Sequence, residues 1–293
     1  MLSELAQSYA EVKTTFDQAS EILGYDLWAL AQEGPAEKQS QTEFTQPLML
    51  VASIACYRLY LSQGGQAPSM AAGHSLGEYA ALYAAGAVSF EDVVSTVKLR
   101  AELMRDAAPN NIGGMAAIIG LDDQAVVQVC ADNKGNDVLE AVNFNAPGQV
   151  VVSGHVAALE RSLGAFKEAG AKRALMLSVS VPNHSALMMP AVEPLYQRLQ
   201  EVVGDAKFPV VQNFSAKAAT SKDALLSNLK QHVAAPVKWV DCVSELKALG
   251  AMQMFEFGPG KVLTGLAKRI DKSLSAACVE SPDSLAAVLT PAE

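Results

Sequence analysis

The stretch from Gly73 to Gly77 constrains the fold of this chain more than any other part of its sequence. It reads Gly-His-Ser-Leu-Gly, the G-x-S-x-G pattern of a sharp strand-to-helix turn with a serine at its apex. Both glycines are expected to provide the room that such a turn needs. Small apolar residues precede the turn over 67–72, and good helix formers follow it over 78–85. The pattern therefore predicts a strand, an outward-pointing Ser75 hydroxyl and a helix, in that order.

The composition excludes several classes of protein. The 293 residues suffice for one large domain or for a domain with an insertion, and 50% of them are hydrophobic. A net charge of −9 argues against general binding to nucleic acid. The sequence contains no apolar run of membrane-spanning length and no secretion signal, so no membrane association is expected. Four cysteines without C-x-x-C spacing are expected to be reduced thiols, as in a cytoplasmic protein.

Helical patterns lie on both sides of the turn. Residues 1–30 have apolar side chains at helical spacing, and Gly34-Pro35 then breaks the pattern. A further helix is expected behind Thr45-Gln46-Pro47, with Pro47 in its first turn. Phe90 begins the second helix after the turn, which carries Arg100.

The segment at 112–181 alternates strands and helices in an order of its own. Strands are expected at 115–119, 138–143, 149–153 and 174–179, and helices at 122–131 and 156–169. This βαββαβ order is the ferredoxin-like pattern. We therefore expect a large α/β domain made of residues 1–111 and 182–293, with an inserted small domain at 112–181.

A serine nucleophile needs a base within hydrogen-bonding reach, and histidine is the usual one. Of the four histidines, His74 adjoins the serine, but neighbours across a tight turn point in different directions. His155 and His232 lie at helix ends and are expected on the surface. His184 lies where the chain leaves the small domain, at an expected cleft between domains. His184 is therefore the candidate base, and a purely structural role stays open as the alternative.

An acyl group that carries a carboxylate needs a cation near the serine. Arg100 lies on the second helix after the turn, from where its guanidinium can reach the mouth of a cleft. A guanidinium can hold a carboxylate through two parallel hydrogen bonds. The alternative for Arg100 is an ordinary arginine on a solvated helix face.

Several segments together resemble the malonyl-CoA:acyl carrier protein transacylase family, which loads malonyl groups in bacterial fatty acid synthesis. They are Gly73–Glu78, Thr45–Pro47, Arg100, Gly113–Ala117, Val142–Gln149, Val181–His184 and Phe257–Lys261. This combination covers essentially the whole chain and is highly specific in that order. The resemblance implies an α/β-hydrolase-like large domain with an inserted ferredoxin-like small domain. It also implies a monomer that uses no cofactor and no metal.

The resemblance implies a ping-pong reaction through a malonyl-Ser75 ester. His184 would be the acid-base group of both halves, oriented by a backbone carbonyl rather than by an aspartate. Arg100 matches the arginine that holds the malonyl carboxylate, and the Leu76 N–H matches one oxyanion donor. The further substrate-binding residues are Gln46, His74, Asn143 and Asn145.

The chain departs from the family pattern in two places. Family members begin with a hydrophobic strand and a Gly-Gln-Gly-Ser-Gln loop that lies upstream of the position of Met1. That loop supplies the second oxyanion donor, and losing one such donor typically costs about 2.7–4 kcal/mol in the barrier. We therefore expect the true N-terminus to lie upstream and the chain as written to be a weak or inactive transacylase. Lys238 replaces a common glutamine, a change that is tolerable if only the backbone carbonyl of this residue orients His184.

The resemblance implies that an acidic acyl carrier protein is the second substrate. Because this chain is also acidic overall, docking needs a local basic patch near the cleft. Lys172-Arg173 and Lys268-Arg269 are the candidates, and ordinary solvated charges are the alternative.

Two other functions share parts of this pattern. A serine esterase or lipase also has the G-x-S-x-G turn, but it needs an acidic triad member and no Arg100. A protein that only binds CoA or the carrier would form no adduct at Ser75.

Overall fold

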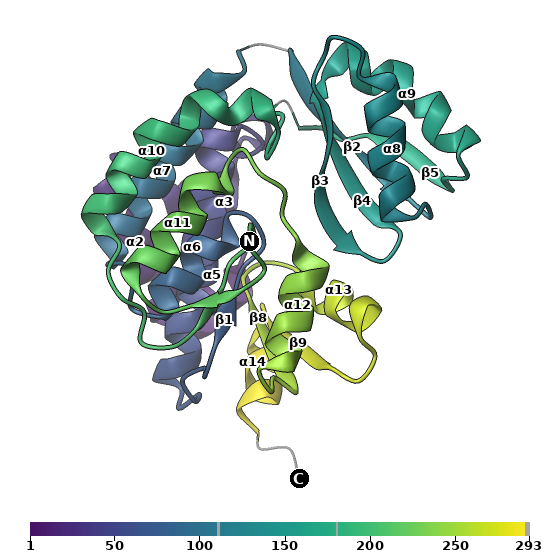
Figure 1. Cartoon of the computed structure of the whole chain (residues 1–293). Helices are drawn as coiled ribbons and strands as arrows, with labels where there is room; N and C mark the ends of the chain where they lie inside the picture. The colour runs from purple at the N-terminus through teal and green to yellow at the C-terminus, as the bar shows by residue number, and fades with distance from the viewer. Residues whose placement is uncertain (110–111, 180, 291–293) are drawn as a thin grey trace.

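The computed structural model describes residues 1–109, 112–179 and 181–290, in which a larger helix-rich part adjoins a smaller part (Figure 1). The smaller part runs from β2 to β5, and the larger part comprises the chain before and after it. The expected junction at 111/112 includes residue 111, which lies outside the described residues. The division into two domains at these positions stays a prediction.

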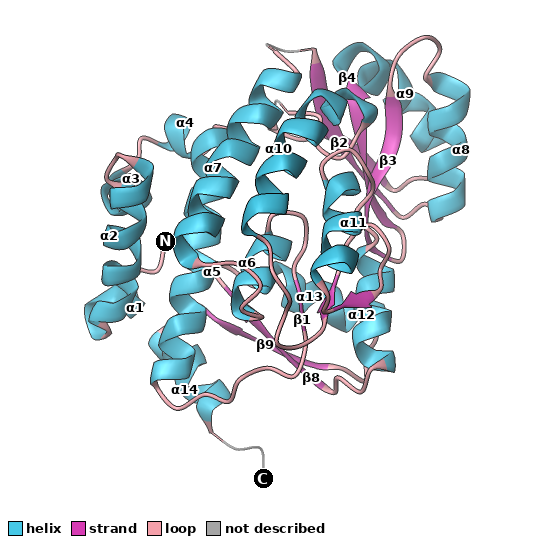
Figure 2. Cartoon of the chain, turned by 60° about the vertical axis from the view of Figure 1, so that its left-hand side comes forward, coloured by secondary structure: helices cyan, strands magenta, loops and turns pink. Residues whose placement is uncertain are grey.

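Helices form most of the larger part (Figure 2). Before the smaller part they are α1 (Ser3–Ser8), α2 (Ala10–Leu23), α3 (Leu27–Glu33), α4 (Ala36–Gln39), α5 (Thr42–Ser62), α6 (Gly77–Ala84) and α7 (Phe90–Ala107). After it they are η1 (Ala186–Met188), α10 (Met189–Val202), α11 (Lys222–His232), α12 (Trp239–Ala248), α13 (Val262–Ile270) and α14 (Pro282–Leu289). None of the described helices is both long and apolar enough to cross a membrane.

Short strands lie among these helices. They are β1 (Ala71–Ala72), β6 (Val210–Val211), β7 (Ala218–Ala219), β8 (Gln253–Phe257) and β9 (Ser275–Val279). β1 pairs in parallel with β6, β6 pairs antiparallel with β7, and β8 pairs in parallel with β9. The main hydrophobic core packs α2, α5, α7 and α10 around this centre. Parallel pairing between strands that are joined through helices agrees with the predicted α/β class.

The prediction for the N-terminal helices was partly wrong. Residues 1–30 form three helices, because Tyr9 is extended between α1 and α2 and Gly24 ends α2 in the left-handed region, with φ 81°. The next helix, α5, begins at Thr42, so Pro47 lies inside it and not in its first turn. Proline removes only the N–H that would bond one turn back, and α5 continues through it.

Six elements were not predicted, namely α4, η1, α10, β7, β9 and α14. Pro190 and Pro194 hide the helical pattern of α10, although Pro190 stands at the start of the helix, where proline is tolerated. The two-residue strand β7 is too short to leave an alternating pattern.

The smaller part confirms the predicted βαββαβ order. Its elements are β2 (Gly113–Ile119), α8 (Asp123–Asn133), β3 (Leu139–Ala146), β4 (Gln149–His155), α9 (Val156–Glu168) and β5 (Arg173–Met176). The four strands form one antiparallel sheet in the order β3-β4-β2-β5, and α8 and α9 lie on the same face of it (Figure 1). This is the strand order of a ferredoxin-like fold.

The sheet of the smaller part buries both of its faces. Ala116 and Ile118 of β2 face the core that also contains Phe166 of α9. Met115, which directly precedes Ala116, packs on the opposite face with Val142. Since successive strand residues point to opposite faces, a sheet covered on both sides needs apolar residues at every position. On the second face, β3 contacts α12 and α13 of the larger part.

The two connections between the parts run side by side at Gly113 and Pro182. A Cβ atom on Gly113 would lie 2.3 Å from the Cγ of Pro182, so only glycine permits this approach. The chain that follows Pro182 returns to the larger part and carries His184. The close crossing therefore fixes where this segment re-enters, which matters for the site described next.

Candidate active site

β1, a tight turn and α6 form the predicted strand-turn-helix around Ser75. Ser75 has φ 50°, in the left-handed region, and α6 begins at Gly77. A Cβ atom on Gly73 would lie 1.9 Å from the carbonyl carbon of Gly77, so this turn requires glycine at position 73. A Cβ atom on Gly77 would meet no described atom within 4 Å. The expectation that both glycines provide room was therefore wrong for Gly77.

Ser75 and His184 lie in direct hydrogen-bonding contact. The distance between Ser75 Oγ and His184 Nε2 is 2.7 Å, and His184 Nδ1 lies 2.9 Å from the backbone carbonyl oxygen of His232. A carbonyl oxygen can only accept a hydrogen bond, so Nδ1 carries the ring proton of the neutral imidazole. Nε2 is then free to accept the proton of the Ser75 hydroxyl.

Backbone strain marks both members of this pair. His184 has φ 64°, so it shares the left-handed conformation of Ser75. A residue other than glycine in this region costs on the order of 1–3 kcal/mol, and such strain is concentrated at functional sites. Two strained residues that contact each other across 109 positions of sequence therefore indicate a reactive centre.

The carbonyl that orients His184 belongs to His232 and not to Lys238, so that condition is not met. The expectation that His232 lies on the surface was wrong, since His232 is only 2% exposed. α11 contains many polar residues, but Leu225, Leu229 and His232 follow one another at helical spacing and form its buried face. That spacing is the signal that could have found His232 from sequence.

The environment of His184 keeps its ring neutral. Burial lowers the pKa of His184 to about 3, and the nearby Arg100 guanidinium acts in the same direction. A histidine with a pKa below the pH of the cell is unprotonated and can accept a proton. The fourth histidine, His155, is half-buried in the smaller part, where its Nδ1 accepts from the Val138 N–H at 2.9 Å.

Arg100 is buried beside Ser75 and is not a solvated arginine. It is 1% exposed, its Nη2 donates to Ser75 Oγ at 3.3 Å, and its Nη1 donates to Gln46 Oε1. Gln46 is held in turn by Thr42 Oγ1, to which its Nε2 donates at 2.8 Å. Burial lowers the pKa of Arg100 from its ordinary value, which is so high that the guanidinium remains a cation. The site therefore combines a hydroxyl, a neutral base and a fixed positive charge.

The other predicted site residues surround this centre without all touching Ser75. His74 Nε2 lies 2.7 Å from Asn145 Oδ1, which joins the turn to the smaller part, and burial lowers the pKa of His74. Asn143 stands on β3, and its buried Oδ1 has no hydrogen-bond partner among the described residues. The backbone hydrogen bonds of the described chain do not use the Leu76 N–H, so it is free to bind an oxyanion at the start of α6.

Sequence reasoning missed Asn213, which holds the turn in place. Asn213 Oδ1 accepts the Ser75 N–H at 2.6 Å, and its Nδ2 donates to the Gly73 carbonyl at 2.8 Å. The backbone N–H of Asn213 donates to Glu78 Oε2 at 2.8 Å. Glu78, in the first turn of α6, is itself only 1% exposed. An asparagine two residues after β6, the strand that pairs with β1, was the available signal.

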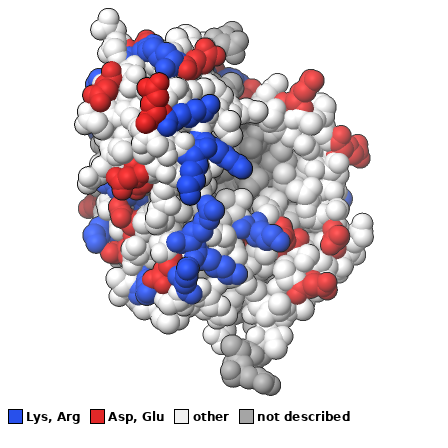
Figure 3. All heavy atoms as spheres, turned by 90° about the vertical axis from the view of Figure 1, so that its right-hand side faces the viewer, with Lys and Arg blue, Asp and Glu red and all other residues white. Residues whose placement is uncertain are grey.

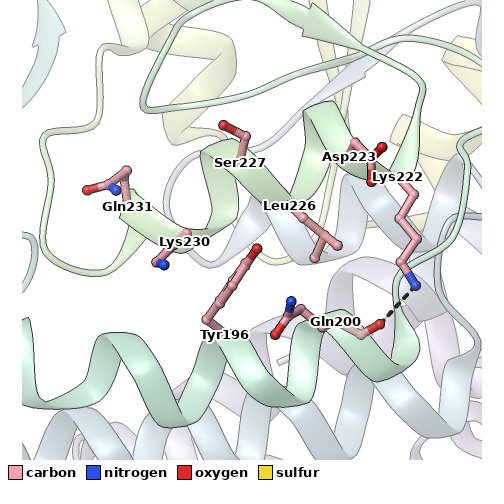
Figure 4. A pocket seen from close by; sticks show the side chains of 8 residues that line it. All are labelled: Tyr196, Gln200, Lys222, Asp223, Leu226, Ser227, Lys230 and Gln231. Atoms are coloured by element: carbon pink, nitrogen blue, oxygen red, sulfur yellow. Dashed lines mark hydrogen bonds between the residues drawn. The ribbon is translucent and has the colours of Figure 1, made fainter.

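A separate hollow of about 580 Å³ lies between α10 and α11 (Figure 4). Its lining side chains are Tyr196, Gln200, Lys222, Asp223, Leu226, Ser227, Lys230 and Gln231. Lys222 Nζ donates to the Gln200 carbonyl at 2.9 Å, and Lys230 Nζ lies 4.7 Å from the centre of the Tyr196 ring. Both lysines are thus engaged by the chain itself. Within the described part of the chain, no three His, Cys, Asp or Glu side chains gather where they could hold a metal ion.

Comparisons with known sequences agree with this geometry. A family model described as an acyl transferase domain matches residues 4–251. The malonyl CoA-acyl carrier protein transacylase of Escherichia coli K12 is 49% identical over 290 residues, which are 99% of this chain and 94% of that protein. The protein of the same description from Bacillus subtilis 168 is 41% identical over 288 residues, which are 97% of this chain and 90% of that one.

Solved structures resemble the whole fold. An acyl carrier protein S-malonyltransferase from Vibrio cholerae has a TM-score of 0.94 at 48% identity and covers 98% of this chain and 94% of its own. A malonyl-transacylase in complex with its type II polyketide acyl-carrier protein has a TM-score of 0.96 at 46% identity, covering 99% and 94%. These neighbours confirm the predicted α/β-hydrolase-like domain with a small ferredoxin-like domain. This chain therefore belongs to the malonyl-CoA:acyl carrier protein transacylase family of acyl transferases.

Proposed function

We propose that this chain transfers a malonyl group from malonyl-CoA to the phosphopantetheine thiol of an acyl carrier protein through an ester on Ser75. One observation carries the proposal. Ser75 Oγ lies 2.7 Å from an unprotonated His184 nitrogen and 3.3 Å from a buried Arg100 nitrogen. A nucleophile, its base and a cation for a carboxylate thus meet at one oxygen atom.

The first half-reaction makes the ester. Ser75 Oγ attacks the thioester carbon of malonyl-CoA while His184 Nε2 takes the hydroxyl proton. The carbonyl oxygen becomes an oxyanion, which the Leu76 N–H stabilises. When the tetrahedral intermediate collapses, the C–S bond breaks and the leaving sulfur takes the proton from His184. CoA departs as the thiol, and malonyl-Ser75 remains.

The second half-reaction reverses these roles. The phosphopantetheine thiol of the carrier gives its proton to His184 Nε2, and its sulfur attacks the ester carbon. Collapse breaks the bond to Ser75 Oγ, which recovers its proton from His184. The proton on His184 Nδ1 stays there throughout and is donated to the His232 carbonyl oxygen, so the ring keeps its orientation.

The charge of the substrate completes the site. In the free enzyme, the Arg100 guanidinium adds to the burial that lowers the pKa of His184. A malonyl carboxylate held by Arg100 offsets that positive charge, so the pKa of His184 rises when substrate binds. An acyl group without a carboxylate leaves the cation uncompensated. We infer that Arg100 selects malonyl in this way, both by binding its carboxylate and by tuning the base.

The test is intact-mass spectrometry of the protein after it is mixed with malonyl-CoA. The proposal expects a malonyl mass increment that is absent from the Ser75→Ala variant and is discharged by a carrier protein bearing phosphopantetheine. A protein that binds malonyl-CoA without any increment would overturn the proposal and support a non-catalytic binding function.

The hydrogen-bond partner of His184 Nδ1 argues against an esterase or lipase function. Such hydrolases orient their histidine with an aspartate or glutamate side chain. Here the partner of Nδ1 is the His232 backbone carbonyl, and the charged Arg100 guanidinium lies 3.3 Å from Ser75 Oγ, where a neutral acyl group would leave its charge unpaired.

The four candidate docking residues form one basic patch, for which we propose contact with the acidic carrier. Arg173 pairs in register with Ile119, Ile119 pairs with Gln149, and Gln149 Oε1 accepts from Arg269 at 2.8 Å. Neighbouring strands lie about 5 Å apart, so Arg173 and Gln149 are about 10 Å apart across β2, and the Arg269 side chain reaches Gln149 from α13. Lys172 and Lys268 directly precede them. Lysine and arginine side chains form a band on the face that carries α13 and β5 (Figure 3).

Reversal of all four charges of the basic patch to glutamate tests this docking proposal. The KM for the carrier should rise about tenfold, because rim charges act mainly on association, while malonylation of Ser75 by malonyl-CoA stays unchanged. A matched control reverses Lys222 and Lys230 in the hollow between α10 and α11 and should leave both rates unchanged. A KM for the carrier that does not move would place docking elsewhere.

A further inference from the structure

Glu78 is a buried carboxylate that the reaction steps above do not use. It lies in the first turn of α6 and is 1% exposed. Its Oε2 accepts the Asn213 backbone N–H at 2.8 Å, and its Oε1 accepts from Gln212 Nε2 at 3.2 Å. A buried carboxylate is costly unless such partners compensate it, so its position calls for a physical reason.

Hydrogen bonds through Asn213 connect Glu78 to the nucleophile, Ser75. The backbone N–H of Asn213 is fixed by Glu78, and the Asn213 side chain in turn grips the turn at Ser75 N and at the Gly73 carbonyl. These two bonds hold the backbone directly before the strained Ser75. The orientation of the Ser75 hydroxyl therefore depends on where Asn213 is held.

Packing contacts through His232 connect Glu78 to the base, His184. His232 Nε2 lies 3.7 Å from Glu78 Oε2, and both side chains are 1% exposed. Neither ring nitrogen of His232 has a hydrogen-bond partner within 3.5 Å among the described residues, so the Glu78 carboxylate is the acceptor that faces Nε2. The His232 ring also packs edge-on against the His184 ring, with centroids 5.6 Å apart. The backbone carbonyl of the same residue accepts from His184 Nδ1.

We propose that Glu78 is a positioning residue that holds Ser75 and His184 in register, the first through Asn213 and the second through His232. This inference rests on the proposed function, because the register of the two side chains matters only if they react together. Glu78 touches neither substrate nor the reacting atoms.

The charges around Glu78 fit a hydrogen-bonded cluster rather than a strong ion pair. Burial raises the pKa of Glu78 to about 7, while the hydrogen bonds from Asn213 and Gln212 and the charge of Arg100 on α7 act against that rise. Burial and Arg100 lower the pKa of His232 well below its ordinary value. A neutral His232 places no second positive charge beside Arg100, and its Nε2 faces the Glu78 carboxylate at 3.7 Å, a packing contact longer than a hydrogen bond.

The decisive variant is Glu78→Gln, which keeps the shape of the side chain. Glutamine can accept from Asn213 through its one carbonyl oxygen, but its NH₂ group then takes the place of Oε1 and opposes the Gln212 Nε2 donor. We expect kcat for malonylation of Ser75 to fall about 10- to 100-fold, since small misplacements of reacting groups have effects of this size. KM for malonyl-CoA should not change, because Arg100 and Gln46 are untouched.

A probe that ignores the malonyl pocket separates positioning from substrate binding. Phenylmethanesulfonyl fluoride reacts with an activated serine and carries no carboxylate for Arg100. The rate of Ser75 sulfonylation in Glu78→Gln should fall by the same factor as kcat for malonylation.

Glu256→Gln is the matched control. Glu256 accepts the backbone N–H groups of Leu263 and Thr264 at 3.0 and 2.7 Å, so the same substitution also weakens two bonds to backbone. These bonds hold the start of α13 and do not reach Ser75. Glu256→Gln should lose some stability and keep both rates at their wild-type values.

His232→Ala approaches the same cluster from the other end and covers the case that Glu78→Gln does not fold. It removes the ring but keeps the backbone carbonyl that His184 needs. It should lower kcat, and the double variant should lose little more than Glu78→Gln alone, because both act through one contact. The proposal is overturned if Glu78→Gln or His232→Ala reacts at the wild-type rate, if the loss lies in KM alone, or if Glu256→Gln loses activity equally. A wild-type protein that reacts with the sulfonyl fluoride but not with malonyl-CoA would refute the proposed function instead.

Discussion

The surroundings of Ser75 and the core of the small ferredoxin-like part are built from opposite kinds of residue. Around Ser75, the buried side chains include Arg100, Glu78, His184 and His232, each at most 2% exposed. The core of the smaller part is a continuous apolar cluster in which Phe166 is fully buried between α9 and the sheet. Both regions are equally inaccessible to water, yet they bury different chemistry.

This difference separates stability from reactivity. Apolar burial contributes about 25 cal/mol per Å² and depends little on the direction of individual contacts. A buried polar cluster contributes little net stability, but each of its groups must find its partner in a fixed geometry. The first region therefore positions reacting atoms, while the second stabilises the chain. Four experiments can test that separation, and the first is expected to give the largest change in activation or unfolding free energy.

Removal of the base should have the largest effect. In His184→Ala, the Ser75 hydroxyl has no acceptor for its proton, and the rate of malonylation should fall about 10⁴-fold or more. Thermal unfolding should change little, because the side chain contributes no apolar core. The measurement is single-turnover mass spectrometry beside a thermal melt. A variant that keeps a substantial rate would remove His184 from its proposed role.

Truncation of a side chain in the apolar core should lower stability and leave the reaction rate unchanged. Phe166→Ala should lower the free energy of unfolding by about 3–5 kcal/mol, as is usual for a buried phenylalanine. Below its melting temperature, the variant should malonylate Ser75 at the wild-type rate. Chemical denaturation and the single-turnover assay measure the two effects separately. A slower reaction in fully folded Phe166→Ala would mean that the two regions are coupled.

Removal of the buried cation should change selectivity. Arg100→Ala should lower kcat/KM for malonyl-CoA. The loss should correspond to about 2–5 kcal/mol of transition-state stabilisation, which is the usual effect of deleting one partner of a buried charge pair. The kcat/KM for acetyl-CoA should fall far less, so the preference for malonyl-CoA disappears. Arg198→Ala is the matched control, because Arg198 pairs with Asp92 at the surface. Equal losses for both acyl groups would show that Arg100 does not read the carboxylate.

The pH dependence of stability should report the buried carboxyl. The pKa of Glu78 is raised from an ordinary 4.5 to about 7, so between these values the folded state binds more protons than the unfolded one. Glu78 therefore contributes stability that is present below pH 4.5 and is lost as the pH rises through about 7, on the order of 3 kcal/mol in total. His184 and His232 act in the opposite direction, because their lowered pKa values remove stability as the pH falls below their ordinary range.

The difference between wild type and Glu78→Gln isolates the carboxyl. We expect the free energy of unfolding of wild type, relative to that of the variant, to decrease from pH 4.5 to pH 7.5. Urea denaturation across this range measures it. A difference that is constant with pH would mean that Glu78 titrates alike in both states.

Sequence reasoning found the residues with a local signature. The Gly73–Gly77 pattern identified the turn at Ser75, and the βαββαβ alternation identified the smaller part, because turns and strand alternation depend on near neighbours in sequence. Asn213 was missed because its two bonds to the turn join positions far apart in the chain. The role of the His232 carbonyl was missed for the same reason, since that carbonyl matters only once α11 is packed beside His184.

The sequence alone determined which chemical groups are present and the order of the elements that carry them. Residue types and spacing alone predict three groups: a hydroxyl on a strand-helix turn, a histidine at a domain crossing and an arginine on a nearby helix. Only the tertiary structure decided which carbonyl fixes the tautomer of His184, that Gly77 needs no space, and that Glu78 is buried between Asn213 and His232. These are contacts between segments that pack from different directions, and their angles and distances are set by the whole core rather than by any local pattern.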